Sequence, residues 1–314
     1  MDYDVIIIGG GPAGYTAGIY NSRARLKTLL VESLSVAGQA VITDTIENYP
    51  GFVDGINGFD LIDRFKKQAE KFGTEIKTTH VKKISPCKDK KSSGWKIECD
   101  KGSFTSLALV IASGASPKKV GVQGEKELQG KGVSYCATCD GPLYRDKEVV
   151  VLGGGDTAVQ EALFLTKFAK KVTLIHRRDR LRATKVLQER ASQNKGMSFL
   201  FESVATEITG KDRVSSVKVK NVKTGKEASV SCDGVFVFVG YTPNTDLVKG
   251  VVKIDEQGYI ATDEDMKTSA PGIFACGDCR HKLLGQVVTA CGDGATAAFS
   301  AQHYVEELKG IAYK

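Results

Sequence analysis

The chain carries the same strand–glycine–helix pattern twice, with the two copies about 144 residues apart. In the first copy the β-branched run Val5–Ile8 leads into Gly9–Gly14, and in the second Glu148–Leu152 leads into Gly153–Ala158. A short apolar run that ends in glycines is typical of a buried parallel strand. The repeat predicts an α/β fold of two Rossmann-like, three-layer ββα domains, each of which binds one dinucleotide.

The first glycine motif has the form G-x-G-x-x-G between a predicted strand and a predicted helix. Its glycines permit a tight turn and close approach of the backbone to a pyrophosphate, whose charge a helix N-terminus stabilises. Glu32 ends the next predicted strand, where a carboxylate can accept from a ribose hydroxyl and would repel a 2′-phosphate. A turn without a ligand is the alternative, but the context favours FAD. The residues expected at this site are Gly9, Gly11, Pro12, Ala13, Gly14 and Glu32.

The second motif has the same geometry, but arginines rather than a carboxylate follow its second strand. Arginines form bidentate, charge-assisted contacts with a 2′-phosphate, which favours NADPH over a solvated basic face. Glu161 lies in the helix after this motif, either as a cofactor contact or as an exposed residue. The residues expected at the NADPH site are Gly153, Gly155, Asp156, Thr157, Ala158, His176, Arg177, Arg178 and Arg182, with Glu161 undecided.

The second unit is predicted to be inserted into the first. Residues 1–114 and 245–314 are expected to form the FAD domain, and residues 115–244 the NADPH domain with the cysteine pair. The crossings fall in segments rich in turn formers. Val81–Ile111 is expected to form a small antiparallel insert, Phe199–Val239 a set of short strands, and about Ala290–Leu308 a closing helix.

Cys136 and Cys139 form a C-x-x-C pair that is followed at once by Asp140 and lies 14 residues before Gly153. Such a pair stores two electrons as dithiol or disulfide, and a nicotinamide supplies electrons two at a time as hydride. A neighbouring acid can manage protons as the thiolates form. The pattern therefore indicates electron transfer from a nicotinamide to a disulfide.

A structural zinc site is the alternative for these cysteines, because C-x-x-C alone is ambiguous. A second pair, Cys276 and Cys279, makes a four-cysteine site formally conceivable. However, Gly277-Asp278 between them follows an apolar strand, as a Gly-Asp that binds a flavin ribityl chain would. We expect no metal, and we take Cys276 and Cys279 as incidental.

Composition places the chain among ordinary globular proteins. Its net charge of +7 arises from 44 basic and 37 acidic residues, most of them scattered, which does not indicate nucleic-acid binding. The first residues lack the basic start of a signal peptide, and no apolar run approaches the roughly 18 residues that span a bilayer. Eight cysteines without an export signal indicate a reducing, cytoplasmic location without membrane association.

Together these features resemble the low-molecular-weight, bacterial-type thioredoxin reductases, which are class II pyridine nucleotide-disulfide oxidoreductases. The resemblance covers essentially the whole chain. Pro142 departs from the pattern, since many relatives have an aromatic residue or alanine there. The motifs that carry the resemblance are Gly9–Gly14, Cys136–Gly141, Gly153–Ala158 with Glu161, His176–Arg178 with Arg182, and Phe274–Asp278 with Gly285–Val287.

The resemblance implies a homodimer with FAD and NADPH that reduces thioredoxin or a thioredoxin-like protein. It implies that Cys139 lies nearer the flavin than Cys136 and that Asp140 handles protons; which sulfur attacks the partner stays open. It also implies further flavin contacts at Gly38, Gln39, Asn48, Ala112, Gly277, Asp278, Gln286 and Val287.

Three other functions share some of these features. A zinc-stabilised dinucleotide-binding protein needs no flavin, a flavin thiol oxidase needs no arginine-bearing NADPH site, and a ferredoxin–NADP reductase needs no cysteine pair. The sequence has all three features, which favours the reductase.

Overall fold

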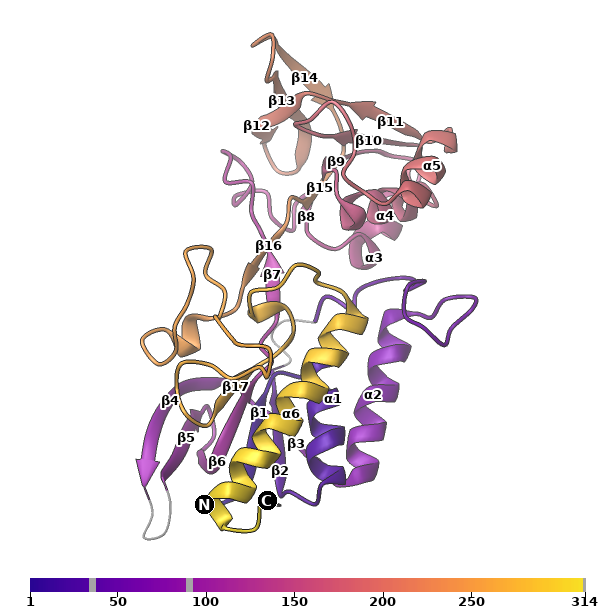
Figure 1. The fold of residues 1–314 in the computed structure, drawn as a ribbon. Helices are drawn as coiled ribbons and strands as arrows, with labels where there is room; N and C mark the ends of the chain where they lie inside the picture. Colours follow the sequence, from indigo (N-terminus) through magenta and orange to yellow (C-terminus); the bar gives the residue numbers. More distant parts are fainter. Residues whose placement is uncertain (34–37, 89–92, 313–314) are drawn as a thin grey trace. The chain divides into compact units, whose positions relative to one another are not determined.

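The structure is a computed structural model that describes residues 1–33, 38–88 and 93–312. It consists of two compact units, one formed by residues 1–116 and 243–314 and the other by residues 117–242 (Figure 1). The two connecting segments pair as short strands, β7 (Ala115–Pro117) and β16 (Tyr241–Pro243).

The first unit is built on a seven-stranded sheet with the order β3-β2-β1-β6-β5-β4, in which β17 also pairs with β6. Strands β1, β2, β3, β6 and β17 pair in parallel. Strand β5 pairs antiparallel with both β6 and β4. The strands are β1 (Tyr3–Ile8), β2 (Thr28–Glu32), β3 (Glu75–Thr78), β4 (Val81–Lys88), β5 (Ser93–Cys99), β6 (Ser103–Ile111) and β17 (Ile273–Ala275).

Three helices lie together on one face of this sheet, with α1 between the other two (Figure 1). Successive side chains of a strand point to opposite faces, so Val5 and Ile7 of β1 join the core under the helices, whereas Ile6 and Ile8 join a second core on the other face. The result is three layers. The helical elements of the unit are α1 (Pro12–Arg23), α2 (Gly58–Phe72), α6 (Val287–Lys309), η2 (Asp246–Val248) and η3 (Gly277–Cys279).

The second unit repeats this plan with a parallel sheet of order β11-β10-β9-β15-β8 and a separate antiparallel sheet of β12, β13 and β14. The predicted α/β class is therefore confirmed. The elements are β8 (Val133–Ser134), α3 (Ala137–Asp140), η1 (Gly141–Tyr144), β9 (Glu148–Gly153), α4 (Asp156–Leu165), β10 (Lys171–Ile175), α5 (Lys185–Gln193), β11 (Met197–Leu200), β12 (Ser203–Gly210), β13 (Val214–Asn221), β14 (Glu227–Ser231) and β15 (Gly234–Phe238).

The prediction that residues 81–111 form antiparallel strands is confirmed by the pairing of β4 with β5 and of β5 with β6, but these strands are not an insert of their own. The second half of β6 pairs in parallel with β1 and lies in the middle of the main sheet, while its first half pairs with β5. The β4–β5 hairpin is thus an extension of the same sheet. Residues 106–111 are buried on both faces, which explains their nearly continuous apolar sequence.

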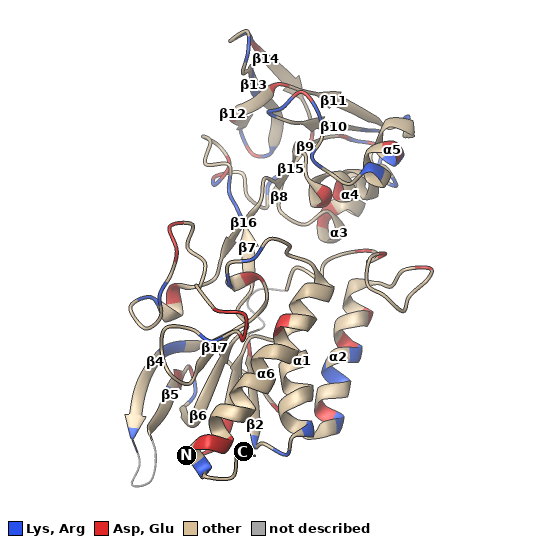
Figure 2. Ribbon diagram, in the orientation of Figure 1, with Lys and Arg blue, Asp and Glu red and all other residues tan. Residues whose placement is uncertain are grey.

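Helix α2 and strand β3 were not predicted, and α6 begins three residues before the predicted start. Helix α2 has clear local signals: the side chain of Asn57 accepts from the N–H of Phe59 (3.0 Å), and Gly73 ends the helix at φ +100°. Both basic and acidic residues are distributed along this helix (Figure 2). Helix α6 begins at Val287 because Gln286 caps it, with Thr289 Oγ1 accepting from the Gln286 N–H (3.2 Å).

Candidate active site

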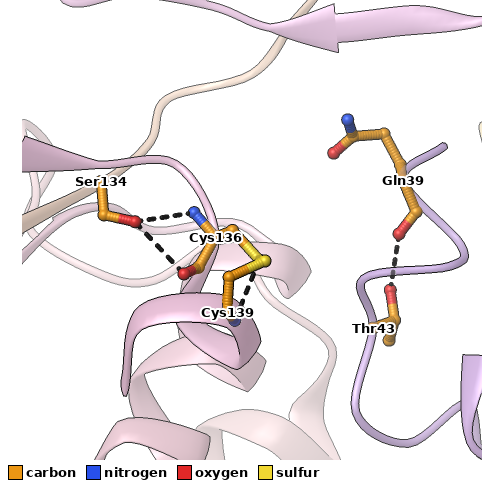
Figure 3. Close-up of a disulfide and its surroundings, with 5 residues drawn as sticks. All are labelled: Gln39, Thr43, Ser134, Cys136 and Cys139. Carbon is orange, nitrogen blue, oxygen red and sulfur yellow. Dashed lines mark hydrogen bonds between the residues drawn. A yellow bond between two sulfur atoms is a disulfide. The ribbon is translucent and has the colours of Figure 1, made fainter. Parts of the chain in front are cut away.

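Cys136 and Cys139 form a disulfide, with 5.4 Å between their Cα atoms. The pair lies where β8 gives way to α3. Ser134 Oγ accepts from the Cys136 N–H (3.1 Å) and donates to the Cys136 carbonyl (3.2 Å), as Figure 3 shows. Cys139 is exposed and Cys136 half-buried. The bond is therefore held firmly at Cys136 and is accessible at Cys139.

Cys136 caps α3, and its sulfur accepts from the Cys139 N–H (3.1 Å). Backbone N–H groups favour a thiolate over a thiol, because they bind the charged form more strongly. Asp140 follows directly as the last residue of α3 and is partly exposed, with its N–H donating to the Cys136 carbonyl (3.3 Å). Its carboxyl group lies near the pair in the chain, and its proton-handling role stays a prediction.

The first glycine motif is a cradle with little room behind it and open space in front. A Cβ atom on Gly14 would lie 1.9 Å from the carbonyl oxygen of Gly9, and one on Gly9 would lie 2.2 Å from that of Ala112. Gly9 also has φ +122°, which an L side chain rarely adopts. A Cβ on Gly11, by contrast, would meet no atom within 4 Å. Pro12 and Ala13 follow as the first two residues of α1.

The other predicted flavin residues gather at the carboxyl ends of β2, β6 and β17. Glu32 ends β2, where its carboxylate accepts from Tyr15 Oη (2.5 Å) and Lys66 Nζ (2.8 Å). Ala112 directly follows β6, and Gly277 and Asp278 begin η3 after β17. Because these strands run parallel in one sheet, with β1 between β2 and β6, their ends share one edge of the sheet, which is where open α/β sheets bind ligands.

Asp278 presents an unusual carboxylate at this edge. Its Oδ1 is buried and accepts no hydrogen bond from any residue that the structure describes, although Lys282 Nζ lies 3.7 Å away. Burial raises the pKa of Asp278, and Lys282 opposes that rise. A buried acceptor without a donor fits a hydroxyl-bearing ligand such as the ribityl chain of a flavin.

The remaining flavin candidates lie in loops around α6. Asn48 Nδ2 donates to Gln286 Oε1 (3.1 Å), and Val287 is the first residue of α6. Gly38 and Gln39 are the first described residues after the gap at 34–37, and the Gln39 carbonyl accepts from Thr43 Oγ1 (2.9 Å).

Asp293 on α6, which was not predicted from the sequence, organises the turn at Gly277. Its carboxylate accepts from the Gly277 N–H (3.1 Å) and pairs with Arg280 (3.3 Å) and Lys282 (3.0 Å). All three charged side chains are largely buried. A signal was available, because Asp293 is an acid among the small residues of Gly292–Ala298.

The second glycine motif has the same construction in the second unit. Gly153 has φ +150°, and a Cβ there would lie 2.4 Å from the Phe238 carbonyl oxygen and 2.6 Å from the Ala158 Cβ. Gly155 is open in front, like Gly11, and caps α4. Asp156, Thr157 and Ala158 form the first turn of that helix, and Asp156 Oδ1 accepts from the Thr184 N–H (2.6 Å).

The basic segment after β10 lies beside this cradle. The Arg182 N–H donates to the Gly154 carbonyl (2.7 Å), and the His176 ring lies so close to Gly154 that a Cβ there would be 2.4 Å from Nδ1. Arg177, Arg178 and Arg182 are exposed, whereas His176 is buried. Burial and, next, the positive charges of these arginines lower the pKa of His176. The arginines are therefore free to meet a phosphate while the histidine packs neutral against the loop.

Glu161 is buried on α4, so the alternative of an exposed helix residue is wrong. Cys276 and Cys279 are also fully buried. The Cys279 thiol donates to the carbonyls of Cys276 (3.3 Å) and Ile111 (3.5 Å), and burial raises the pKa of both thiols. Protonated, inaccessible thiols are poor nucleophiles and poor metal ligands.

Within residues 1–33, 38–88 and 93–312, no three His, Cys, Asp or Glu side chains are grouped to hold a metal ion. In the same part of the chain, no helix combines the length and apolar content needed to cross a membrane.

Comparison with known proteins now decides the family. The profile of the pyridine nucleotide-disulphide oxidoreductases matches residues 3–294. The chain belongs to this family. It is 49% identical over 312 residues to a thioredoxin reductase of Peptoclostridium litorale, covering 98% of each chain, and 46% identical over 308 residues to one of Treponema pallidum (strain Nichols), covering 98% of this chain and 99% of the relative.

Solved structures agree with these relatives. The crystal structure of Lactococcus lactis thioredoxin reductase (FR conformation) has a TM-score of 0.93 at 43% identity, covering 97% of this chain and 99% of that chain. The T. acidophilum thioredoxin reductase has a TM-score of 0.90 at 34% identity, covering 96% and 98%. The resemblance to thioredoxin reductases is confirmed.

Thioredoxin reductases of this family use FAD and NADPH, and the residues present fit both groups. The first unit offers an open glycine turn, a carboxylate at the end of β2 and the Asp278 Oδ1 atom, which accepts no hydrogen bond from the described residues. The second unit offers an open cradle beside three exposed arginines.

We predict that replacing Gly11 or Gly155 by alanine weakens the binding of one nucleotide and leaves the binding of the other unchanged. Both positions have backbone angles that alanine adopts and no atom within 4 Å of a new Cβ, so the fold should persist. The methyl group would occupy the space in front of the helix N-terminus where a pyrophosphate approaches. Gly11→Ala should weaken FAD binding about tenfold or more and leave NADPH binding unchanged, and Gly155→Ala should do the reverse.

Each variant serves as the control for the other, with FAD retention measured by absorbance after dialysis and NADPH affinity by fluorescence titration. Equal losses of both nucleotides in either variant, or none, would contradict the assignment.

Proposed function

We propose that the chain is an NADPH-dependent, FAD-containing thioredoxin-disulfide reductase. The observation that carries this proposal is the Cys136–Cys139 disulfide, accessible at Cys139, on the same unit as the arginine-bearing cradle. The names of the relatives supply the substrate. When bound, NADPH would supply a hydride, and FAD would supply a route for its two electrons to the disulfide.

The two cysteines perform the second half of the reaction. With two electrons and two protons the Cys136–Cys139 bond opens to a dithiol. One sulfur, as thiolate, attacks the disulfide of thioredoxin and forms a mixed disulfide, and the other sulfur then displaces the reduced partner and restores the bond. We propose that Cys139 is the sulfur nearer the flavin and that Asp140 takes and returns the proton.

The glycine cradles and their charged neighbours bind and orient the nucleotides. We propose that the first unit holds FAD through its Gly9–Gly14 turn, Glu32 and Asp278, and that Gly38, Gln39, Asn48, Ala112, Gly277, Gln286 and Val287 line the same cofactor. We propose that the second unit holds NADPH through Gly153, Gly155, Asp156, Thr157, Ala158 and Glu161 and through His176, Arg177, Arg178 and Arg182.

We further propose that the protein is a cytoplasmic homodimer. Six of the eight cysteines form no disulfide, which suits a reducing compartment. Large apolar side chains of α1 and α6, Tyr20 and Phe299 among them, are about half exposed in the single chain. Sedimentation velocity should report a species of two chains; a monomer at micromolar concentration would refute the dimer.

Removing the charge at Arg177, Arg178 and Arg182 should change the choice of nicotinamide. We expect Gln at the three positions to raise the KM for NADPH about tenfold to a hundredfold, because charge-assisted hydrogen bonds to the 2′-phosphate are lost. The KM for NADH should change little. Arg180→Gln, an exposed arginine of the same segment, is the matched control. Equal effects on both nucleotides would contradict 2′-phosphate recognition.

The proposed function itself is tested by Cys139→Ser. This variant should bleach its flavin with NADPH at the wild-type extent but reduce oxidised thioredoxin at less than about one hundredth of the wild-type rate, because the disulfide relay is broken. Cys87→Ser, a half-buried cysteine on β4, should retain the wild-type rate. If Cys139→Ser reduced thioredoxin at the wild-type rate, the proposed function would be contradicted.

A further inference from the structure

A buried glutamate lies in the segment that leads to the redox-active pair. Glu125 is only 2% exposed, and its carboxylate accepts three hydrogen bonds, from the N–H groups of Val120 (2.9 Å) and Gly121 (2.6 Å) and from Tyr135 Oη (2.8 Å). All three of these donors are neutral groups. Burying a carboxylate costs free energy unless it is hydrogen-bonded in this way. Glu125 therefore links Val120, Gly121 and Tyr135 to one another through its two oxygens.

The turn that carries Glu125 is fixed to the antiparallel sheet of the same unit. Gly124 has φ +84°, and a Cβ there would lie 1.8 Å from the carbonyl oxygen of Ile208 on β12. The Ile208 N–H donates to the Gln123 carbonyl (2.9 Å). Glu125 therefore projects from a rigid platform rather than from a mobile loop.

Tyr135 connects this platform to the disulfide, because it directly precedes Cys136. Its hydroxyl stays protonated, since burial and, next, the bond to Glu125 raise its pKa. On its other side Ser134 belongs to β8, which pairs with β15 of the parallel sheet, and its hydroxyl binds both backbone groups of Cys136. The chain just before Cys136 is thus anchored to both sheets of the unit.

We propose that Glu125, acting through the Tyr135 hydroxyl, is a positioning residue that keeps Cys136 within bonding reach of Cys139 when the pair is reduced. The inference rests on the proposed function in that it concerns the same redox-active pair. Two thiols held close form a disulfide with a high effective concentration, and loosening one of them lowers that concentration. The hydrogen bond between Glu125 and Tyr135 therefore influences the reduction potential of the Cys136–Cys139 pair. That potential sets how completely the dithiol reduces a partner disulfide.

The test is the redox equilibrium of the pair in the holoenzyme, measured in glutathione buffers without thioredoxin. Acid quenching, alkylation and mass spectrometry of the peptide with Cys136 and Cys139 report the dithiol fraction independently of the flavin. Tyr135→Phe removes the hydroxyl that donates to Glu125. Glu125→Gln is nearly isosteric, but its amide N–H group would face one of the donors that now bind the carboxylate. Each should lower the equilibrium constant for disulfide formation about threefold to tenfold, and tenfold corresponds to a midpoint about 30 mV more positive.

Tyr3→Phe is the matched control, because Tyr3 Oη donates to Glu75 Oε2 at the same 2.8 Å in the other unit. It should leave the midpoint unchanged whatever it does to thermal stability. An unchanged midpoint in Tyr135→Phe, or an equal shift in Tyr3→Phe, would overturn the positioning role. Because thioredoxin takes no part, these outcomes do not depend on whether thioredoxin is the substrate.

Discussion

In each unit a close backbone approach made by the glycine turn sets the geometry of the nucleotide site. At Gly14 there is no room for a side chain against the Gly9 carbonyl, and at Gly153 none against Phe238 and Ala158. These contacts draw the N-termini of α1 and α4 onto the carboxyl edge of their sheets. Gly11 and Gly155 stay open in front, so a pyrophosphate can meet unpaired N–H groups of the helix. The charged residues at the following strand ends then distinguish the two sites.

The second unit adds to this repeated plan a disulfide whose position is set by hydrogen bonds rather than by packing alone. Ser134 fixes the backbone of Cys136, and the Glu125–Tyr135 contact fixes the residue between them. Cys276 and Cys279 have the same spacing but lie fully buried with raised thiol pKa values. Because the C-x-x-C spacing is the same in both pairs, accessibility and the backbone N–H at the Cys136 sulfur are the features that favour Cys136 and Cys139 as the redox-active pair.

The features predicted from sequence were those encoded locally. The two strand–glycine–helix units depend on neighbouring residues, and the structure contains them with ends within one or two residues of the prediction. Strand β6 was assigned to a small antiparallel insert, whereas its pairing with β1 depends on residues about 100 positions earlier. Helix α2 was missed although Asn57 and Gly73 mark its ends. Asp293 and Glu125 could not be placed, because the donors that give each carboxylate its role meet it only after folding.

The central claim is that electrons from NADPH arrive at Cys136 and Cys139 and at no other cysteine. An anaerobic titration with NADPH, followed by acid quenching, alkylation and mass spectrometry, measures this directly. The account predicts that both positions change from disulfide to alkylated thiols as NADPH is consumed, two thiols for each pair of electrons beyond those held by the flavin, while the alkylation of Cys276 and Cys279 stays constant. A pair that remains oxidised while the flavin is fully bleached would contradict it.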